Sequence, residues 1–249
     1  MSEKGFAIVT GSAKGLGAGM VRQLAKEGYD VLINHVSESS GPKAAALAEE
    51  VKKEYGVGAI VFQGDVSKYE VCQNMVKAGV EAFGENLSVL INNAGLTNSN
   101  TFESIPHEKY EYLIGVEVLG SMNCTHCALP YMQKNKGGNI IFTSSIGGLL
   151  GQVTEAPYSG AKAFLHGFAR ALARENVGYG IRVNCIAPGL IWTDIFNGCS
   201  EEVLAATKAS IPMQRFGEIE DVAQCMSYIL SANYVTGQIL SPNGGIAMY

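Results

Sequence analysis

Short apolar runs alternate with longer amphipathic stretches along nearly the whole chain. Seven of these runs have the length of β-strands and contain few polar residues, which is the pattern of strands buried on both faces. They cover residues 6–10, 31–35, 59–62, 89–92, 139–144, 181–186 and 237–240. Because strands and helices alternate, we expect an α/β fold with a doubly wound parallel sheet of about seven strands and helices on both of its faces.

Serine and proline residues indicate where helices begin. Ser40-Gly-Pro42 puts a proline into a first helical turn, where its missing N–H group is not needed. Ser67-Lys-Tyr-Glu70 has the spacing of a capping box, in which the serine and glutamate side chains accept hydrogen bonds from backbone N–H groups. The segment at about 192–216 breaks the alternation and is expected to form a loop or a short helix over a site.

Composition narrows the class of protein. The chain has 249 residues, 47 % of them hydrophobic and 16 % charged, and contains no linker or repeat, so we expect a single domain over residues 1–249. A net charge of −5 without a lysine or arginine cluster argues against a nucleic-acid partner. We find no signal peptide and no apolar stretch of about 20 residues, which argues against a membrane and favours a cytoplasmic protein. The cysteines, including Cys124-x-x-Cys127, lack metal-ligand spacing, so we expect free thiols and no metal.

A glycine-rich turn follows the first predicted strand. Its sequence, Thr10-Gly-Ser-Ala-Lys-Gly-Leu-Gly17, leads directly into a helical pattern. Glycines let the backbone turn sharply and approach a ligand, and the N-terminus of the next helix offers free N–H groups to a pyrophosphate. The alternative is a turn that serves only to pack the strand against the helix. Because the turn follows the first strand of an alternating chain, we favour a Rossmann-type dinucleotide site with contacts from Gly11, Ser12, Lys14, Gly15, Leu16 and Gly17.

Tyr158 and Lys162 are four residues apart at the start of a predicted helix, so their side chains share one face. A free phenol has a pKa of about 10 and is a poor acid–base catalyst at neutral pH, whereas a nearby fixed cation favours the phenolate. Ser145 follows a strand, and its hydroxyl can hold the substrate oxygen that Tyr158 protonates or deprotonates. The alternative, which is the commoner one for such a pair in isolation, is an ordinary amphipathic pair whose polar ends reach solvent.

Taken together, these motifs resemble the short-chain dehydrogenase/reductase family over essentially the whole chain. Besides the glycine turn and the trio Ser145, Tyr158 and Lys162, three segments match the family: Asp65-Val66, Asn92-Asn93-Ala94-Gly95, and Pro188-Gly189 followed by Ile191 and Thr193. The resemblance implies that the first segment reaches the adenine, the second supports the sheet and lines the cofactor, and the third cradles the nicotinamide. Five motifs in the correct order are far more specific than any one of them.

The resemblance also implies an NAD(P)-dependent oxidoreductase and a mechanism for it. A hydride passes between the nicotinamide and the substrate carbon, and Tyr158 gives or takes the proton on the oxygen. Ser145 orients that oxygen, while Lys162 assists Tyr158 and binds the nicotinamide ribose. Two alternatives remain open: a non-catalytic nucleotide-binding regulator, against which the intact trio argues, and an isomerase or dehydratase, whose known examples have longer chains.

One position departs from the family's pattern. Twenty-five residues beyond Asn92, where the family usually carries an asparagine, this chain has Glu117. The resemblance implies that this asparagine shapes a helix kink and a water-linked proton path to the lysine. A glutamate there can preserve the path through its backbone carbonyl, add a negative charge near Lys162, or simply pack and pair locally. If Glu117 belongs to the proton path, Glu117→Asn is expected to alter the pH–rate profile.

The end of the second strand bears on the choice between NAD and NADP. A carboxylate there binds the adenosine ribose and repels a 2′-phosphate. This strand ends in Asn34-His35-Val36, and the first carboxylate is Glu38. Lys14 is placed to meet a 2′-phosphate and His35 is a further candidate contact, so NADP(H) is favoured over NAD(H). The alternative is that Lys14 is a solvated surface lysine.

The substrate is expected to be a small apolar carbonyl compound or alcohol. The predicted loops around the nicotinamide carry Leu96, Ile146, Leu149, Leu150, Val153, Trp192, Phe196 and Leu204. If these residues are not core or subunit interface, they suit a steroid, a bile acid or a medium-chain 3-oxoacyl compound. Tyr179-Gly180 stands where carrier-protein reductases tend to have arginine, which slightly disfavours a carrier-borne substrate. The resemblance also implies a homotetramer, formed through the helices that carry Glu117 and Tyr158.

Overall fold

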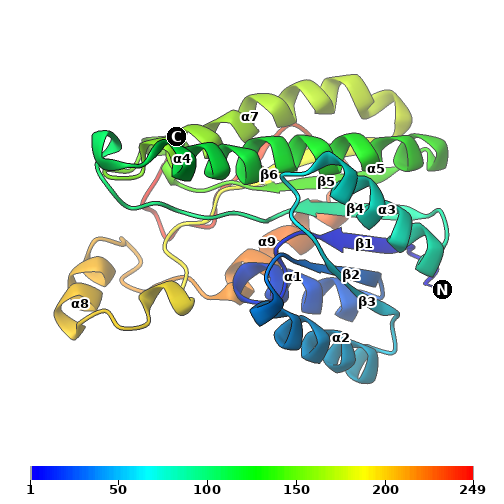
Figure 1. Ribbon diagram of the computed structural model, residues 1–249, viewed down its shortest axis with the longest axis horizontal. Helices are drawn as coiled ribbons and strands as arrows, with labels where there is room; N and C mark the ends of the chain where they lie inside the picture. Colours follow the sequence, from blue (N-terminus) through cyan, green and yellow to red (C-terminus); the bar gives the residue numbers. More distant parts are fainter. Residues whose placement is uncertain (1, 249) are drawn as a thin grey trace.

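Within residues 2–248, which the computed structural model describes, a parallel sheet of seven strands forms the centre of the molecule (Figure 1). The strands are β1 (Phe6–Val9), β2 (Asp30–His35), β3 (Ala59–Gln63), β4 (Leu87–Asn92), β5 (Gly138–Thr143), β6 (Ile181–Ile186) and β7 (Ile239–Leu240). Their order is β3-β2-β1-β4-β5-β6-β7, and every adjacent pair is parallel. The predicted doubly wound sheet is confirmed, and the predicted strand boundaries differ from the observed ones by at most two residues.

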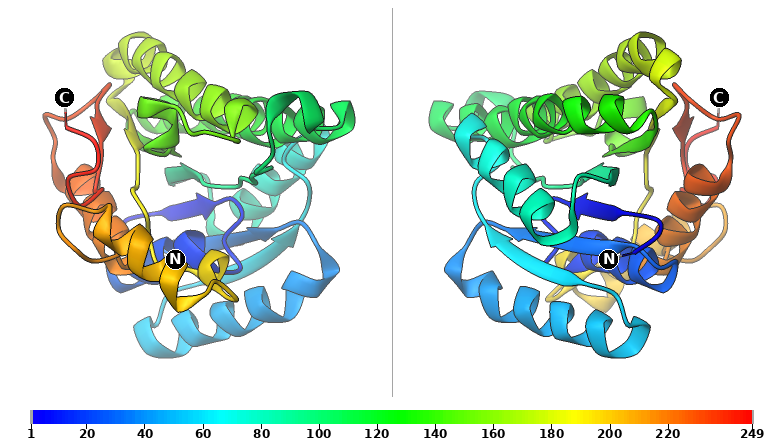
Figure 2. Two further views of the ribbon diagram at one scale, coloured as in Figure 1. Left: turned by 90° about the vertical axis from the view of Figure 1, so that its left-hand side faces the viewer. Right: turned by 90° about the vertical axis from the view of Figure 1, so that its right-hand side faces the viewer.

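Alternate side chains of each strand face opposite sides of the sheet. In β1, Phe6 and Ile8 belong to one apolar cluster, whereas Ala7 and Val9 belong to the other. Helices α3 (Tyr69–Phe83), α5 (Ser121–Asn135) and α7 (Ala156–Asn176) cover the first cluster, and α1 (Gly15–Lys26), α2 (Gly41–Tyr55) and α9 (Ile219–Ser231) cover the second. Figure 2 shows these helical layers on the two sides of the sheet. The central strands β1, β4 and β5 are largely apolar because both of their faces are buried, whereas the edge strand β3 is partly exposed.

A long helical rod lies between β4 and β5 in the sequence. Helix α4 (His107–Ile114) continues through a π-helical turn, η3 (Gly115–Gly120), into α5, and the junction residues keep helical backbone angles. A π-turn inserts an extra residue into the helical ladder and often marks a functional position. Here the turn carries Glu117, whose side chain is only 1 % exposed.

The segment at about 192–216 contains short helices. Its elements are η5 (Asp194–Phe196) and α8 (Glu201–Ala209), and α8 stands away from the sheet with none of its residues buried (Figure 1). The rings of Trp192, Phe196 and Phe216 pack together with centroids 4.8–5.6 Å apart, which holds the two ends of the segment to each other. The remaining short elements are η1 (Glu38–Ser40), η2 (Phe102–Ser104), α6 (Gly147–Leu150) and η4 (Val177–Tyr179).

Both of these predicted helices begin at the expected segments, but the capping box predicted for the second helix is wrong. Helix α2 has Pro42 in its first turn, as expected. Helix α3 begins at Tyr69 without the predicted capping box, and Ser67 Oγ has no hydrogen-bond partner among residues 2–248. Instead the Ser67 N–H donates to the Asp65 carboxylate at 2.9 Å. An aspartate that caps the preceding turn in this way replaces the serine cap.

The length and hydrophobicity of the helices bear on membrane spanning. Across residues 2–248, no helix has both the length and the apolar character needed to cross a lipid bilayer.

Candidate active site

A cavity of about 860 Å³ opens at the edge of the sheet where the strands end. Its wall is formed by segments that follow β1, β3, β4, β5 and β6, together with the start of α7. Open parallel sheets bind their ligands at this edge, near the point where the strand order reverses. Here that point lies between β1 and β4, which are neighbours in the sheet.

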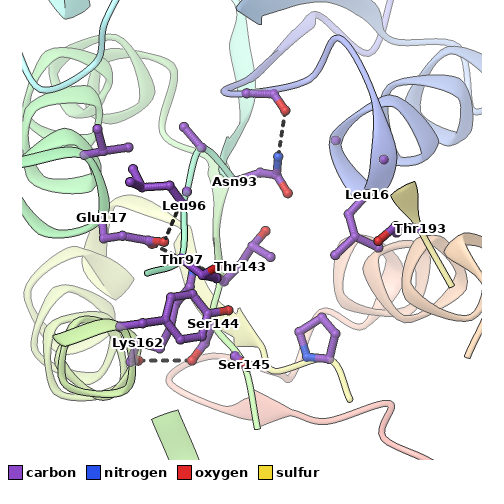
Figure 3. A pocket seen from close by; sticks show the side chains of 18 of the residues that line it. Leu16, Asn93, Leu96, Thr97, Glu117, Thr143, Ser144, Ser145, Lys162 and Thr193 are labelled. Atoms are coloured by element: carbon purple, nitrogen blue, oxygen red, sulfur yellow. Dashed lines mark hydrogen bonds and ion pairs between the residues drawn. The ribbon is translucent and has the colours of Figure 1, made fainter. Parts of the chain in front are cut away.

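The turn after β1 forms one end of the cavity. Gly11 and Gly15 have φ angles of +60° and +57°, which favour glycine, and a Cβ on Gly11 would lie 2.7 Å from Ala94 Cα. A Cβ on Gly17 would lie 2.7 Å from the Gly11 carbonyl oxygen. Asn93 Nδ2 donates to that same oxygen at 3.1 Å and so ties the turn to the segment after β4 (Figure 3). The turn leaves backbone N–H groups at the N-terminus of α1 open to the cavity, which fits a dinucleotide pyrophosphate.

Ser145, Tyr158 and Lys162 line the other end of the same cavity. Ser145 follows β5, whereas Tyr158 and Lys162 lie one turn apart on α7. A Cβ on Gly147 would lie 3.4 Å from both Ser145 Oγ and Tyr158 Cε1, so these two side chains flank the same small space. The Nζ atom of Lys162 lies 5.4 Å from the centre of the Tyr158 ring. The structure therefore brings together the three side chains that the sequence singled out.

Lys162 is a buried ammonium with two close partners. Its side chain is 4 % exposed, and its Nζ donates to the Thr143 carbonyl oxygen at 2.8 Å and pairs with Glu117 Oε2 at 2.7 Å. Burial by itself lowers the pKa of Lys162, but the charge of Glu117, with a smaller contribution from the Tyr158 side chain, outweighs burial and raises the pKa above its usual value. The lysine is therefore a cation at neutral pH.

The carboxylate of Glu117 joins Lys162 to the segment that follows β4 (Figure 3). Its Oε1 accepts a hydrogen bond from the Leu96 N–H at 3.1 Å. A Cβ on Gly95 would lie 2.5 Å from this oxygen, so only glycine leaves room for it. The Glu117 carbonyl oxygen accepts from Ser121 Oγ at 2.8 Å. Among the interpretations left open by the sequence, the structure contains the negative charge beside Lys162.

The titratable groups behind Lys162 are neutral near pH 7. Ser144 Oγ donates to the Lys162 carbonyl oxygen at 3.0 Å and lies 2.7 Å from His166 Nε2. Burial, helped by the nearby charge of Arg170, lowers the pKa of His166. Burial raises the pKa of the Cys185 thiol to about 12. Neither group adds a charge next to the Lys162–Glu117 pair.

Three predicted cofactor contacts have side chains outside the cavity wall. Ser12 is buried and donates to the Val9 carbonyl oxygen at 2.7 Å, and Asn92 Nδ2 donates to Thr125 Oγ1 at 3.1 Å. The His35 ring is also buried and lies beside Ser37 and Ser40. Asn92 and His35 end β4 and β2, where successive side chains point to opposite faces, and Ser12 lies in the turn after β1. Contacts of these three residues with a cofactor stay predictions. Asn34 and Val36, on either side of His35, line the cavity instead.

The remaining predicted contacts lie where the sequence suggested. The cavity wall includes Gly11, Lys14, Gly15, Leu16, Gly17, Asp65, Val66, Ala94, Gly95, Pro188, Gly189, Ile191 and Thr193. Of the apolar residues expected around a substrate, Leu96, Ile146 and Phe196 line the wall, while Leu150, Val153 and Trp192 are exposed and Leu204 lies on the projecting α8. The pocket is therefore less apolar than the sequence analysis expects.

Polar residues of the wall account for that difference. Gln152 and Glu155, neither of which was predicted from the sequence, line the cavity close to Tyr158. Glu155 is 6 % exposed, and its Oε1 accepts a hydrogen bond from Ser99 Oγ at 2.7 Å. Glu155 is the N-cap residue of α7, three positions before Tyr158. That spacing, which puts two residues on one helix face, is the signal that could have identified it.

In the Cys124-x-x-Cys127 motif, the thiol of Cys124 has Cys72 as its hydrogen-bond partner. Cys124 Sγ lies 3.4 Å from Cys72 Sγ, with both residues buried, and the hydrogen bond with the Cys72 thiol together with burial raises the pKa of Cys124. Over the described part of the chain, residues 2–248, no group of three or more His, Cys, Asp or Glu side chains is arranged to hold a metal ion.

Comparison with known proteins adds independent information about this cavity. A family model described as enoyl-(acyl carrier protein) reductase matches residues 11–247. The 3-oxoacyl-[acyl-carrier-protein] reductase FabG of Staphylococcus epidermidis is 36 % identical over 244 residues, which cover 97 % of this chain and 98 % of the relative. The protein of the same name from Staphylococcus aureus matches with the same identity and coverage. Nodulation protein G of Azospirillum brasilense is 38 % identical over 248 residues, 99 % of either chain.

A solved structure extends the likeness to three dimensions. It is that of a blue fluorescent protein from a metagenomic library in complex with NADPH, and it matches with a TM-score of 0.91 and 30 % sequence identity over 98 % of both chains. Since the likeness covers essentially the whole chain, it includes every segment that lines the cavity.

Proposed function

Because the chain belongs to the short-chain dehydrogenase/reductase family, and is thereby an NAD(P)-dependent oxidoreductase of C=O and CH–OH groups, we propose that it is an NADPH-dependent reductase of 3-oxoacyl thioesters. Family membership confirms the resemblance noted in the sequence. The observation that carries the proposal is the convergence of Ser145, Tyr158 and Lys162 at one end of a cavity that has the glycine turn at its other end. Such a cavity brings a nucleotide, a carbonyl group and a proton donor together.

NADP(H) is the cofactor that this cavity fits. The glycine turn and the N-terminus of α1 would hold the pyrophosphate, and Lys14, which is exposed at the cavity wall, would contact the 2′-phosphate. Asn34 and Val36 occupy the wall after β2, where a carboxylate would repel that phosphate. Of the other cavity-lining residues, Asp65 and Val66 would hold the adenine and Ala94 and Gly95 the middle of the cofactor. The nicotinamide would be held by Pro188, Gly189, Ile191 and Thr193. The NADPH bound by the blue fluorescent protein supports the expected preference for NADP(H) over NAD(H).

The reaction divides between cofactor and protein. NADPH, when bound, supplies the hydride for the carbonyl carbon. Tyr158 donates its phenolic proton to the carbonyl oxygen, so that hydride and proton together give the alcohol. Ser145 donates a hydrogen bond to the same oxygen and fixes its position beside the phenol. Lys162 holds its ammonium near the Tyr158 ring, where it stabilises the phenolate left after proton transfer.

The substrate class rests on the relatives and on the mixed lining of the cavity. Relatives at 36 % identity are named as reductases of 3-oxoacyl groups on a carrier protein, and a steroid or bile acid has no comparable support. Leu96, Ile146 and Phe196 provide an apolar wall for an acyl chain, while Gln152 and Glu155 provide hydrogen-bond acceptors near the reacting group. Thioesters of coenzyme A and of carrier protein carry amide N–H groups that such acceptors suit.

The deciding experiment measures NADPH oxidation by the purified protein with four substrates. They are a 3-oxoacyl thioester on coenzyme A, the same acyl group on acyl carrier protein, a trans-2-enoyl thioester and a steroid ketone. We expect reduction of the 3-oxoacyl thioesters, and a loss of about 10²–10⁴-fold in kcat for Tyr158→Phe with NADPH binding retained. A preference for the enoyl thioester would move the chemistry to the C=C bond. Tight NADPH binding without any turnover would favour the nucleotide-binding regulator.

A homotetramer in the cytoplasm completes the proposal. Leu119 on η3 and Met122 on α5 are large apolar side chains that are 48 % and 39 % exposed. Exposed apolar surface on helices next to the cavity suits contact with further copies of the chain. Static light scattering is expected to give four times the mass of one chain, and the mass of a single chain would contradict the proposal.

A further inference from the structure

Glu117 and Lys162 form a buried ion pair that the reaction scheme does not require. The two side chains are 1 % and 4 % exposed, and their charged atoms lie 2.7 Å apart. Removing two charges from water is unfavourable, and the mutual attraction compensates only when further hydrogen bonds complete the site. Here the Leu96 N–H and the Thr143 carbonyl oxygen provide those bonds. The surrounding backbone therefore completes the hydrogen bonding of the pair. The pair lies at the end of the cavity lined by Ser145, Tyr158 and Lys162, which we call the catalytic end.

Two features of the backbone hold the carboxylate in this position. The π-helical turn η3 carries Glu117 on the buried side of the rod formed by α4 and α5. Gly95 leaves the space that the carboxylate fills, since a Cβ there would come within 2.5 Å of Oε1. Because the glutamate side chain is fixed from both sides, its carboxylate stays in contact with the Lys162 ammonium group and does not turn towards solvent.

Few other charges act on this pair. The titratable groups that face Lys162 are Glu117 on η3, Tyr158 on α7 and Cys185 on β6. Burial keeps Cys185 and His166 neutral, as described above, and burial also raises the pKa of Tyr112, which reaches the cavity from α4. The other charged groups of the wall are Asp65, Glu155, Asp194 and Lys14, and those of α7 are Arg170, Arg174 and Glu175. Of all these, Glu117 is the one in direct contact with the ammonium group.

We propose that Glu117 is a positioning residue whose negative charge offsets the positive charge of Lys162 and so keeps Tyr158 in its proton-donating form. This favours carbonyl reduction over alcohol oxidation. An ammonium alone stabilises the phenolate, whereas a carboxylate in contact with that ammonium weakens its field at the phenol. Reduction needs the phenol and oxidation needs the phenolate. The inference rests on the function proposed for Tyr158. The equilibrium of the reaction is unaffected, and what changes is the pH range over which each direction runs.

The first test follows Tyr158 without any nucleotide. The ultraviolet absorbance of phenolate is titrated in the wild-type protein and in Tyr158→Phe, and the difference isolates Tyr158. We expect no phenolate contribution from Tyr158 at neutral pH in the wild type. A clear contribution at neutral pH would overturn the inference, whatever happens to any Glu117 variant.

The second test removes the charge and keeps the shape. In Glu117→Gln the phenolate signal of Tyr158 and the alkaline fall of the reduction rate are both expected about one pH unit lower, since a neighbouring charge shifts a titration by about 1–3 units. At an alkaline pH above both midpoints, reduction is then about tenfold slower than in the wild type. Oxidation of the product alcohol is expected to gain its activity about one unit lower as well.

Three further variants separate charge from structure. Glu117→Asn is a second neutral variant in case Glu117→Gln does not fold, and it should show the same direction of shift. Glu117→Asp keeps the charge and should stay close to the wild-type profile. Glu111→Gln, on the exposed face of α4, is the control and should change neither titration. Equal profiles for the neutral and the charged variants would mean that Glu117 is merely structural.

The outcomes also separate this inference from the proposed function. If Tyr158→Phe abolishes reduction while the neutral Glu117 variants leave both titrations unmoved, only the inference fails. If Tyr158→Phe reduces the substrate as fast as the wild type does, the role of Tyr158 fails and the inference falls with it.

Discussion

The two ends of the cavity are built from different parts of the chain. At the glycine end, the turn after β1 offers mainly backbone atoms, and Lys14 is its charged side chain. At the catalytic end, the contacts come from side chains, and two of these carry opposite charges in a buried pair. The glycine end depends on space and on backbone angles, whereas the catalytic end depends on charge.

This difference decides which changes each end tolerates. Adding even one methyl group to a closely packed site costs about 1–3 kcal/mol, because neighbouring atoms must move. Removing one partner of a buried ion pair costs about 3–5 kcal/mol, because the other charge is left unpaired. We therefore expect volume changes to act on nucleotide affinity at the glycine end, and charge changes to act on the pH dependence at the catalytic end.

Gly17→Ala is expected to give the larger effect at the glycine end. The new Cβ would lie 2.7 Å from the Gly11 carbonyl oxygen, 2.7 Å from Ser12 Cα and 2.7 Å from Asn93 Nδ2, and two of these are backbone atoms of the turn itself. If about 2 kcal/mol of overpacking is relieved by moving the turn, the Kd for NADPH rises about 30-fold. Fluorescence titration with NADPH measures this change.

The matched control is Gly167→Ala. Gly167 lies in α7, and among residues 2–248 no atom other than those of its chain neighbours and of the helix backbone around it lies within 4 Å of the position of its Cβ. Its alanine variant should bind NADPH like the wild type. The contrast between the two ends would be wrong if Gly17→Ala bound NADPH normally but shifted the pH profile of turnover. A volume change at the glycine end would then act on the chemical step rather than on nucleotide affinity.

The glycine end was the more predictable of the two from sequence. Its signals are local: apolar strands, the spacing of Gly11, Gly15 and Gly17, and a helix that starts at once. His35, which was expected among the cofactor contacts, is buried beside η1, while Asn34 and Val36 face the cavity. When a strand is apolar on both faces, the sequence pattern does not say which set of alternate residues faces the ligand.

The catalytic end was predictable only in part. The spacing of Tyr158 and Lys162 on one helix carries local information, and the strand before Ser145 gives its location. The contact between Glu117 and Lys162 joins two helical segments that are distant in sequence, and the π-turn that directs Glu117 inward leaves no periodic signal. The capping box predicted at Ser67 does not form, because the Asp65 carboxylate accepts a competing local hydrogen bond from the Ser67 N–H.

Lys14→Ala is the smallest change and tests whether the glycine end really lacks charge dependence. Lys14 is exposed at the cavity wall, where an ammonium acts on a 2′-phosphate as a partly screened point charge. We expect the Kd for NADPH to rise about tenfold, which corresponds to ~1.4 kcal/mol, and the Kd for NADH to stay nearly constant. Lys26→Ala, at the far end of α1, is the control and should change neither Kd. Because salt screens an exposed charge, the advantage of NADPH in the wild type should also shrink as ionic strength rises. Equal losses for both nucleotides would mean that Lys14 supports the turn rather than the phosphate, and the glycine end would then depend on backbone geometry alone.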